Sequence, residues 1–383
     1  MGLQTPIDLD HLATTPLDPR VLDVMLPVLQ EQHGNPGSPH QAGWAAAALV
    51  ERAREQVAEL VGAESREIIF TSGATESINL ALKGVTDLYP NPGHLVTTVL
   101  EHSAVVQTID TLVSRGWRTT VVGCDESGVI APEAVAVALT DETALVSITA
   151  VQNEIGTVQR WPEISAVCQE RGIPLHLDGA QALGKVPLHA TDDGVALLSM
   201  SAHKLYGPKG VGALFLRRRS PRMTLQRQID GGEQERGLRS GTLNVAGIVG
   251  MGEACRLAIE EREQRVEHLR TLTAQLYTMI ADRYPDVRLT GSSTRRLPGS
   301  LHLMFPGVRA DRLIRAVPTL LLSAGPACGS GSHNVSPVLT ALGLDEQAAG
   351  SCVRICLGKD ATLEEVHHAA ECLLAAVTQL RES

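Results

Sequence analysis

The chain has 383 residues, of which 43% are hydrophobic and 20% charged, and its formal net charge is −10. This length is typical of about two domains, and the composition is that of a globular protein with a sizeable core. The acidic balance argues against direct nucleic-acid binding, which needs a basic surface. Because the chain contains no run of roughly 18 apolar residues, we expect no membrane span.

The seven cysteines are odd in number and widely spaced, and none of them forms a CxxC pair. This pattern is not typical of a disulfide framework or a zinc site, and it indicates a reducing compartment. Residues 1–9 contain no basic region followed by an apolar stretch. The sequence therefore predicts no signal peptide and a cytoplasmic protein that holds no metal.

Short apolar segments alternate with helical patterns through the first two thirds of the chain. Helices are expected at 44–61, from about 75, from about 103, and at 132–139, 162–171, 244–282 and 362–380. Strands are expected at 67–71, 95–100, 118–122, 144–149, 174–178, 195–199 and 211–216. This alternation predicts an α/β fold with a mostly parallel sheet that helices cover on both faces.

Several of the expected strands are followed directly by a polar side chain. Segment 72–76 follows a strand and opens a helix, a place that favours a phosphate, although a simple N-cap is the alternative. His102, Asn153 and Asp178 also follow strand ends, where ligands bind in doubly wound sheets. Asp178 would suit a protonated pyridine nitrogen or a helix cap, and His102 would stack on a flat ring or be structural.

Lys204 lies between two apolar strands, among small hydroxyl residues and before a Gly-Pro turn. A lysine in such a turn suits a Schiff base with an aldehyde cofactor, which requires a lowered pKa; the alternative is an ordinary surface lysine. The convergence of Lys204 with the strand-end residues favours pyridoxal 5′-phosphate. We find no GxGxxG opening a helix, no Walker lysine and no HExxH that would indicate NAD, ATP or a metal.

The chain resembles the cysteine desulfurases of the class V aminotransferase family, in the group that includes the nitrogenase and iron–sulfur cluster desulfurases. The resemblance covers nearly the whole chain and is carried by these stretches: 9–16, 34–38, 70–76, 101–105, 153–156, 178–181, 201–204, 231–242 and 327–328. It implies a fold-type I transferase with a large domain (15–256) built on a mostly parallel seven-stranded sheet covered by helices. A smaller α+β domain (1–14 and 257–383) would carry the catalytic cysteine loop.

The resemblance also implies a role for each matching residue. Lys204 would hold pyridoxal 5′-phosphate, and His102 and Asp178 would contact its ring. The side-chain amides of Asn153 and Gln181 would contact the ring oxygen of the cofactor. Its phosphate would be bound by Ala74, Thr75, Ser201 and His203, and by Thr242 from the partner in a homodimer.

L-cysteine would be the substrate, with Arg354 and Asn35 binding it. The structural alternative for Arg354 is a salt bridge. Cys328, in a loop rich in glycine and serine at 323–332, would accept the sulfur and pass it to an acceptor protein. The other cysteines lie in helical or strand-like surroundings, except that Cys352 and Cys356 flank Arg354.

Three positions depart from the family pattern. Leu12 stands where asparagine is usual, Glu233 replaces a glycine, and Pro326 replaces the serine usual before Ala327-Cys328. Pro326 should stiffen the approach to Cys328, and the chain stops at Ser383 without the tail of the iron–sulfur type. Sulfur delivery to iron–sulfur clusters, tRNA thiolation and DNA phosphorothioation all fit, with phosphorothioation as the favoured specialised route.

Two other classes of function stay open. One is another enzyme of the same fold, such as a selenocysteine lyase or an aminotransferase, and an aminotransferase would not need Cys328. The other is a non-enzymatic scaffold of a sulfur pathway, which would bind no cofactor and would not be yellow. The set of Lys204, Asp178 and His102 favours the enzyme.

Overall fold

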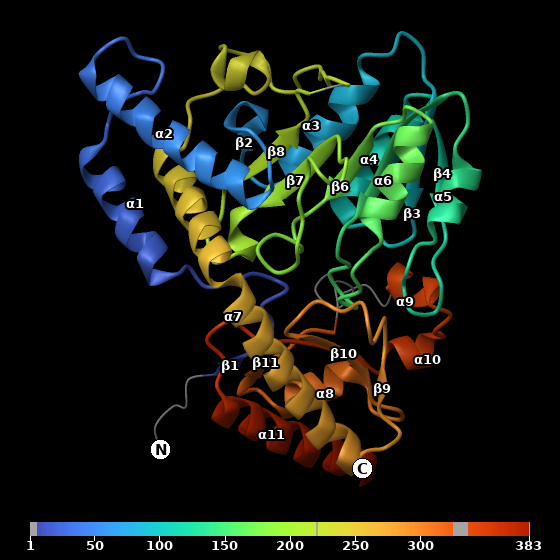
Figure 1. Ribbon diagram of the computed structural model, residues 1–383. Helices are drawn as coiled ribbons and strands as arrows, with labels where there is room; N and C mark the ends of the chain where they lie inside the picture. The colour runs from blue at the N-terminus through green and yellow to red at the C-terminus, as the bar shows by residue number, and fades with distance from the viewer. Residues whose placement is uncertain (1–5, 220, 325–335, 383) are drawn as a thin grey trace.

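The structure is a computed structural model, and it describes residues 6–219, 221–324 and 336–382. A large domain lies above a smaller one, and the 39-residue helix α7 (Val245–Arg283) runs through both (Figure 1). The first half of α7 packs in the core of the large domain, and its second half packs in that of the small domain. Among the residues described, no helix is both long and apolar enough to cross a bilayer.

The large domain is built on a seven-stranded sheet in the order β2-β8-β7-β6-β5-β3-β4. Only β8 runs antiparallel to its neighbours, so the mostly parallel sheet predicted from the sequence is confirmed. The strands are β2 (Ile68–Thr71), β3 (His94–Thr98), β4 (Arg118–Val122), β5 (Thr143–Thr149), β6 (Leu175–Asp178), β7 (Leu197–Ser201) and β8 (Gly212–Leu216).

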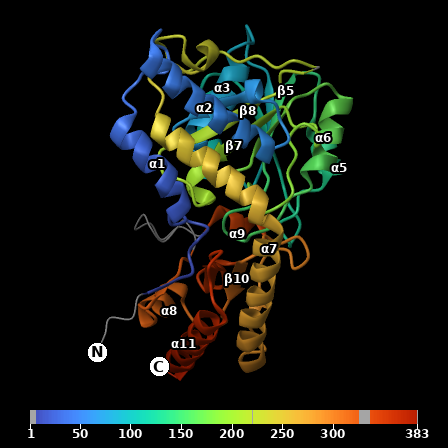
Figure 2. The same ribbon diagram turned by 60° about the vertical axis from the view of Figure 1, so that its left-hand side comes forward.

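Helices cover both faces of this sheet, and residues along the strands alternate between two cores. In β2, for example, Ile69 packs in the core beneath α3 and α4, whereas Ile68 and Phe70 pack in the opposite core. Figure 2 shows α1, α2 and the upper half of α7 side by side over one face. The helices are α1 (Pro19–Glu31), α2 (Gln41–Leu60), α3 (Ala74–Thr86), α4 (Ser103–Ser114), α5 (Pro132–Ala138) and α6 (Trp161–Glu170).

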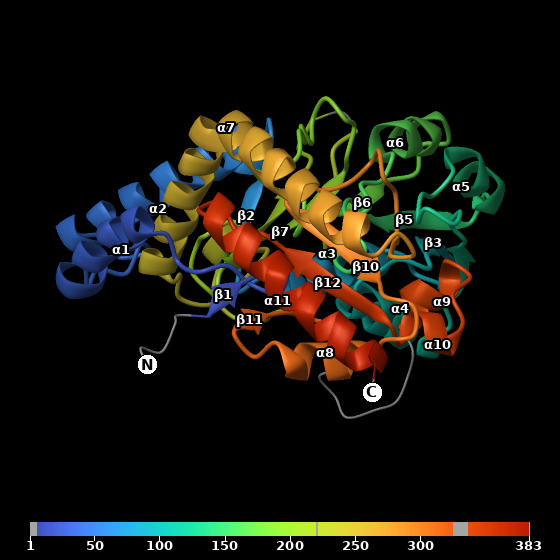
Figure 3. The same cartoon turned by 90° about the horizontal axis from the view of Figure 1, so that it is seen from below.

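The small domain contains a three-stranded antiparallel sheet of order β12-β10-β9. Seen from below, α11 lies beside the lower half of α7 (Figure 3). The N-terminal β1 (Ile7–Asp8) pairs with β11 (Leu320–Leu321). The other elements are α8 (Ala310–Ala316), α9 (Pro337–Ala341), α10 (Glu346–Ala349), α11 (Leu363–Glu382), β9 (Arg288–Leu289), β10 (Ser300–Met304) and β12 (Cys352–Cys356).

Most expected elements occur within a few residues of their predicted bounds. Two expected strands are displaced: 195–199 is observed as β7 two residues later, and 95–100 ends at Thr98 because the chain turns before α4. The helix α1 was not predicted, since Pro27 lies inside it. The last helix, α11, begins with a capping box, in which the Thr362 N–H donates to Glu365 Oε2 at 2.8 Å and the Glu365 N–H donates to Thr362 Oγ1 at 3.2 Å.

Candidate active site

A cavity of about 610 Å³ opens at the carboxyl ends of the parallel strands. It is lined by most of the side chains that the sequence analysis selected, although these come from different strand ends. Those lining residues are Ala74, Thr75, His102, Asn153, Asp178, Gln181, Ser201, His203, Lys204 and Arg354. The expected residues therefore share one cavity.

Two predicted site residues in the described part of the chain do not line the cavity, and a third cannot be placed. Asn35 is exposed, and its Oδ1 accepts a hydrogen bond from Gly37 N–H at 3.0 Å. Thr242 is also exposed, at the end of a loop that Arg239 ties to Glu76 of α3 by an ion pair of 2.8 Å. Cys328 lies outside the described residues.

Lys204 ends a short 3-10 helix, η2 (Ala202–Lys204), directly after β7. Burial, with the nearby cations Lys185 and Arg354, lowers the pKa of Lys204 to about 8. Its Nζ donates to the backbone carbonyls of Leu12 at 2.6 Å and Ala13 at 2.7 Å. An amine held in this way is partly neutral near pH 8 and suited to attack a carbonyl.

Asp178 is the last residue of β6 and is buried. Burial raises the pKa of its carboxyl group, whereas the Ala180 N–H, which donates to Oδ1 at 3.0 Å, and the nearby His102 and Lys204 oppose the increase. A buried carboxylate gains most from a positively charged partner. Asp178 therefore fits a protonated ring nitrogen.

His102 is the N-cap of α4, and its Nδ1 accepts a hydrogen bond from Ala104 N–H at 3.1 Å. This bond leaves the proton of a neutral ring on Nε2 and fixes the plane of the ring. His203 is held by Thr14, whose Oγ1 lies 3.0 Å from its Nδ1. Burial, with the charge of Lys204, lowers the pKa of His203 to about 4, so this ring is neutral.

The start of α3 suits a phosphate group. Gly73 has a φ of 155° as the N-cap, and within the described part of the chain no side chain caps this helix. The first turn therefore presents backbone N–H groups at Ala74 and Thr75 beside the cavity. A Cβ at Gly73 would meet nothing within 4 Å, so the φ value rather than crowding accounts for this glycine.

Arg354, in the middle of β12, extends from the small domain to the cavity. Its Nη2 donates to Asp10 Oδ1 at 2.6 Å, and its Nη1 donates to the Asn153 carbonyl at 2.9 Å. Its Nε is buried and has no partner among the described residues. Arg354 thus makes the salt bridge that was its structural alternative and retains a donor for a further acceptor.

Sequence reasoning missed three contributors to the site. Leu12 was expected to lack a polar role, and its side chain is buried, yet its carbonyl also accepts a hydrogen bond from Gln181 Nε2 at 2.8 Å. Lys185 is a second half-buried amine, and its Nζ donates to Gln181 Oε1 at 3.3 Å. Glu101 is a buried carboxyl near Asp178, and burial raises its pKa to about 8. The only signals in the sequence were the position of Lys185, four residues after Gln181, and that of Glu101, directly before His102.

Five of the six described cysteines have thiols that are poorly suited to act as nucleophiles. Burial raises the pKa of Cys168 and of Cys352 to about 12 and that of Cys356 to about 11. The pKa values of Cys124 and Cys255 are also raised by burial. Since the thiolate is the reactive form, these cysteines match the inert class expected of structural thiols.

Residues 7–368 match the family model described as aminotransferase class-V. The chain is 46% identical to the cysteine desulfurase IscS of Neisseria meningitidis serogroup C, covering 100% of this chain and 95% of the relative. It superposes on a NifS-like protein with a TM-score of 0.91 and 34% identity, covering 98% of this chain and 100% of the other. It also superposes on SspA in complex with cysteine, with a TM-score of 0.81, 35% identity, and coverage of 92% and 99%.

Proposed function

Since this chain belongs to the aminotransferase class-V family, we propose that its cavity is the site of a pyridoxal 5′-phosphate-dependent cysteine desulfurase. In this reaction L-cysteine becomes L-alanine, and its sulfur is left as a persulfide on Cys328. The observation that carries the proposal is the half-buried amine of Lys204 in one cavity with Asp178 and His102. Desulfurase relatives of nearly equal length support the same reaction.

The residues of the cavity fit the cofactor. When bound, pyridoxal 5′-phosphate supplies an electron sink that stabilises negative charge at the substrate Cα. Lys204 would form the covalent link and then move the proton of that carbon. Asp178 would hold the ring nitrogen in its protonated form, and His102 would lie against the ring. The first turn of α3, with Ser201 and His203, would bind the phosphate.

Arg354 would bind the substrate carboxylate. The guanidinium of Arg354 lines the cavity, and its N–H groups that bond neither Asp10 nor Asn153 would form charge-assisted hydrogen bonds with a carboxylate. Asp10 and the Asn153 carbonyl meanwhile fix the orientation of the guanidinium. The structure thus supports substrate binding at the end of the cavity nearest the small domain.

The thiolate form of Cys328 would accept the substrate sulfur. A bond forms between the Cys328 sulfur and the substrate sulfur as the Cβ–S bond of the substrate breaks, and the bonding electron pair stays with the carbon skeleton. Protonation of that skeleton then yields alanine. Burial raises the pKa values of other cysteines, such as Cys168 and Cys352, so their thiols stay protonated and are poor nucleophiles. This contrast supports Cys328 as the sulfur acceptor.

The protein would act as a homodimer in the cytoplasm. Thr242 is exposed and does not line the cavity of its own chain, which supports its role as a phosphate ligand in the partner subunit. The cytoplasmic assignment depends on the odd, widely spaced cysteines. Sedimentation at micromolar concentration should give a dimer. A monomer that still binds the cofactor fully would contradict the shared site.

The persulfide sulfur would pass to an acceptor protein of iron–sulfur cluster assembly. The 46% identity to an IscS relative supports this route over DNA phosphorothioation, which stays a prediction from the sequence around Cys328. Incubation with L-cysteine, iron and a scaffold protein should form clusters with the wild-type enzyme and not with Cys328→Ser.

Alanine released from L-cysteine under reducing conditions tests the proposal. The wild-type protein should produce alanine, and Cys328→Ser should bind the cofactor without turning over, whereas Cys372→Ser, a change at another free cysteine, should behave as the wild type. Turnover with a keto acid would instead indicate an aminotransferase, and preference for selenocysteine a lyase. A colourless protein would indicate that no cofactor is bound, and it would contradict the proposal that the protein is an enzyme of this kind.

A further inference from the structure

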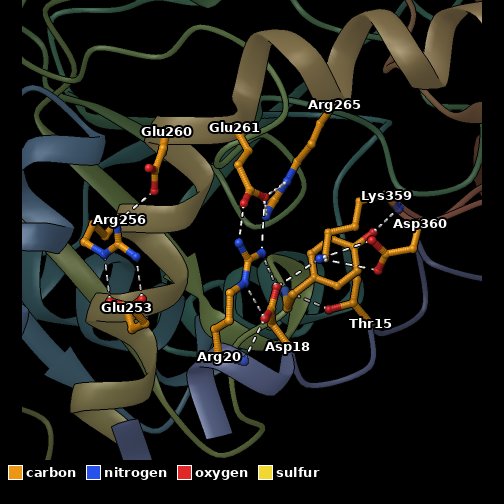
Figure 4. A network of polar contacts seen from close by, with 11 residues as sticks. Thr15, Asp18, Arg20, Glu253, Arg256, Glu260, Glu261, Arg265, Lys359 and Asp360 are labelled. Atoms are coloured by element: carbon orange, nitrogen blue, oxygen red, sulfur yellow. Dashed lines mark hydrogen bonds and ion pairs between the residues drawn. The ribbon is translucent and has the colours of Figure 1, made fainter. Parts of the chain in front are cut away.

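An ionic network joins the N-terminal segment, α7 and the small domain (Figure 4). Its centre is Asp18, whose carboxylate is 1% exposed. Arg20 Nη2 and Lys359 Nζ approach the same carboxylate oxygen, Oδ2, at 2.8 Å and 2.9 Å. Arg20 also pairs with Glu261 of α7, which pairs with Arg265. Because Lys359 follows β12, the network includes both domains.

The same two residues, Asp18 and Lys359, hold Tyr206. The Tyr206 hydroxyl accepts a hydrogen bond from Lys359 N–H at 2.7 Å, and its carbonyl accepts one from Asp18 N–H at 3.0 Å. Lys359 Nζ also lies 5.2 Å from the centre of the Tyr206 ring, a cation–π distance. Tyr206 has a φ of 64°, which is rare for a residue with a bulky side chain. Such a conformation persists only where the surroundings fix it.

Tyr206 is two residues after Lys204, and one N-terminal segment, residues 12–18, lies along both. The Tyr206 N–H donates to Thr15 Oγ1 at 2.8 Å, and the Thr15 N–H donates to the His203 carbonyl at 3.0 Å. The same segment supplies the carbonyls of Leu12 and Ala13 that hold the Lys204 amine. The turn that carries Lys204 is therefore bonded on one side to a segment that ends at Asp18.

We propose that Lys359 is a positioning residue for Lys204: from the small domain it fixes Asp18 and Tyr206, and these fix the turn that carries the cofactor lysine. The inference rests on the proposed role of Lys204. It means that docking of the small domain, which also brings Arg354 to the cavity, sets the geometry at which the lysine meets the cofactor.

The positioning role of Lys359 can be tested by mutation. Asp18 keeps Arg20 as a partner when Lys359 is changed, so Lys359→Met does not leave a buried carboxylate unpaired. Tyr206→Phe removes only the hydroxyl that accepts the Lys359 N–H. Arg256 is a matched control, since on α7 it pairs with Glu253 at 2.7 Å and, in the described part of the chain, makes no hydrogen bond or ion pair with Asp18. Figure 4 shows this separate group of ion pairs on the same helix.

The test measures the dissociation constant for pyridoxal 5′-phosphate, the visible circular dichroism per bound cofactor, and kcat and KM for alanine release. Lys359→Met should weaken cofactor binding about tenfold and alter the dichroism, and Tyr206→Phe should do so about threefold. The loss should fall on kcat more than on KM. Lys359→Arg keeps a cation beside Asp18 and should lose less affinity than Lys359→Met, and Arg256→Met should match the wild type.

Wild-type dichroism and affinity in Lys359→Met would overturn the inference, as would losses equal to those of Arg256→Met. If Lys359→Met does not fold, Tyr206→Phe decides: a changed dichroism supports the inference and an unchanged one overturns it. A wild-type protein that takes up no cofactor contradicts the proposed function and the inference together. A wild-type protein that binds it while the variants are indistinguishable contradicts the inference alone.

Discussion

The floor and the rim of the cavity are built in different ways. The floor consists of residues at strand ends of one sheet, such as Asp178 and Lys204, whose places follow from local sequence. The rim brings together Asp10 and Arg354, which are 344 positions apart in the chain. In the proposed function the floor would face the cofactor and the rim the substrate, so chemistry and substrate affinity should respond to different mutations.

Asp178→Asn should give the largest effect, because it removes the charge that holds the ring nitrogen protonated. We expect kcat to fall by about 10²–10⁴-fold, the range of a lost proton-transfer or charge-stabilising group, with KM changed little. Steady-state alanine release measures both constants. An equal rise in KM with kcat unchanged would place Asp178 at the rim rather than the floor.

Arg354→Gln should act mainly on substrate binding. A charge-assisted hydrogen bond contributes about 1.5–3 kcal/mol, so KM for L-cysteine should rise about 10–100-fold, with a smaller change in cofactor affinity. Asp10→Asn tests the same site through the residue that pairs with Arg354, since it leaves Arg354 in place but weakens the hydrogen bond that orients its Nη2. A loss of cofactor binding with an unchanged KM would contradict the division between rim and floor.

Capture of the cofactor by the apoprotein should depend on pH through Lys204. Only the neutral amine attacks, and the pKa of Lys204 is lowered to about 8. The association rate constant should therefore fall about tenfold per pH unit below that value and level off above it. Stopped-flow absorbance measures this profile, and a small free amine serves as control because its rate should keep rising towards pH of about 10.

Leu12→Asn should have the smallest effect on the site, because the contact to Lys204 comes from the backbone carbonyl. Cofactor affinity should stay within about twofold, whereas the free energy of unfolding should fall by about 1–3 kcal/mol on burial of a polar amide. Cofactor titration and urea unfolding measure the two. A large loss of affinity with stability unchanged would show that the side chain itself acts in the site.

The difference between floor and rim also explains what could be predicted from the sequence. Strand ends could be recognised because apolar runs such as Leu175–Asp178 end in a polar residue, and parallel strands place those ends together. The pairing of β1 with β11 could not, because each has only two residues and the partners lie far apart in the chain. The role of Leu12 could not be predicted either, since a backbone carbonyl leaves no signature in the residue type.

The central claim is that Lys204, rather than the other half-buried amine Lys185, bonds to the cofactor. Both have a pKa lowered to about 8 by burial, but only Lys204 lines the cavity. Borohydride reduction of the yellow protein, followed by peptide mass spectrometry, locates the bond directly. We expect the pyridoxyl group on the peptide that contains Lys204. A pyridoxyl group on Lys185 or any other lysine would contradict the account.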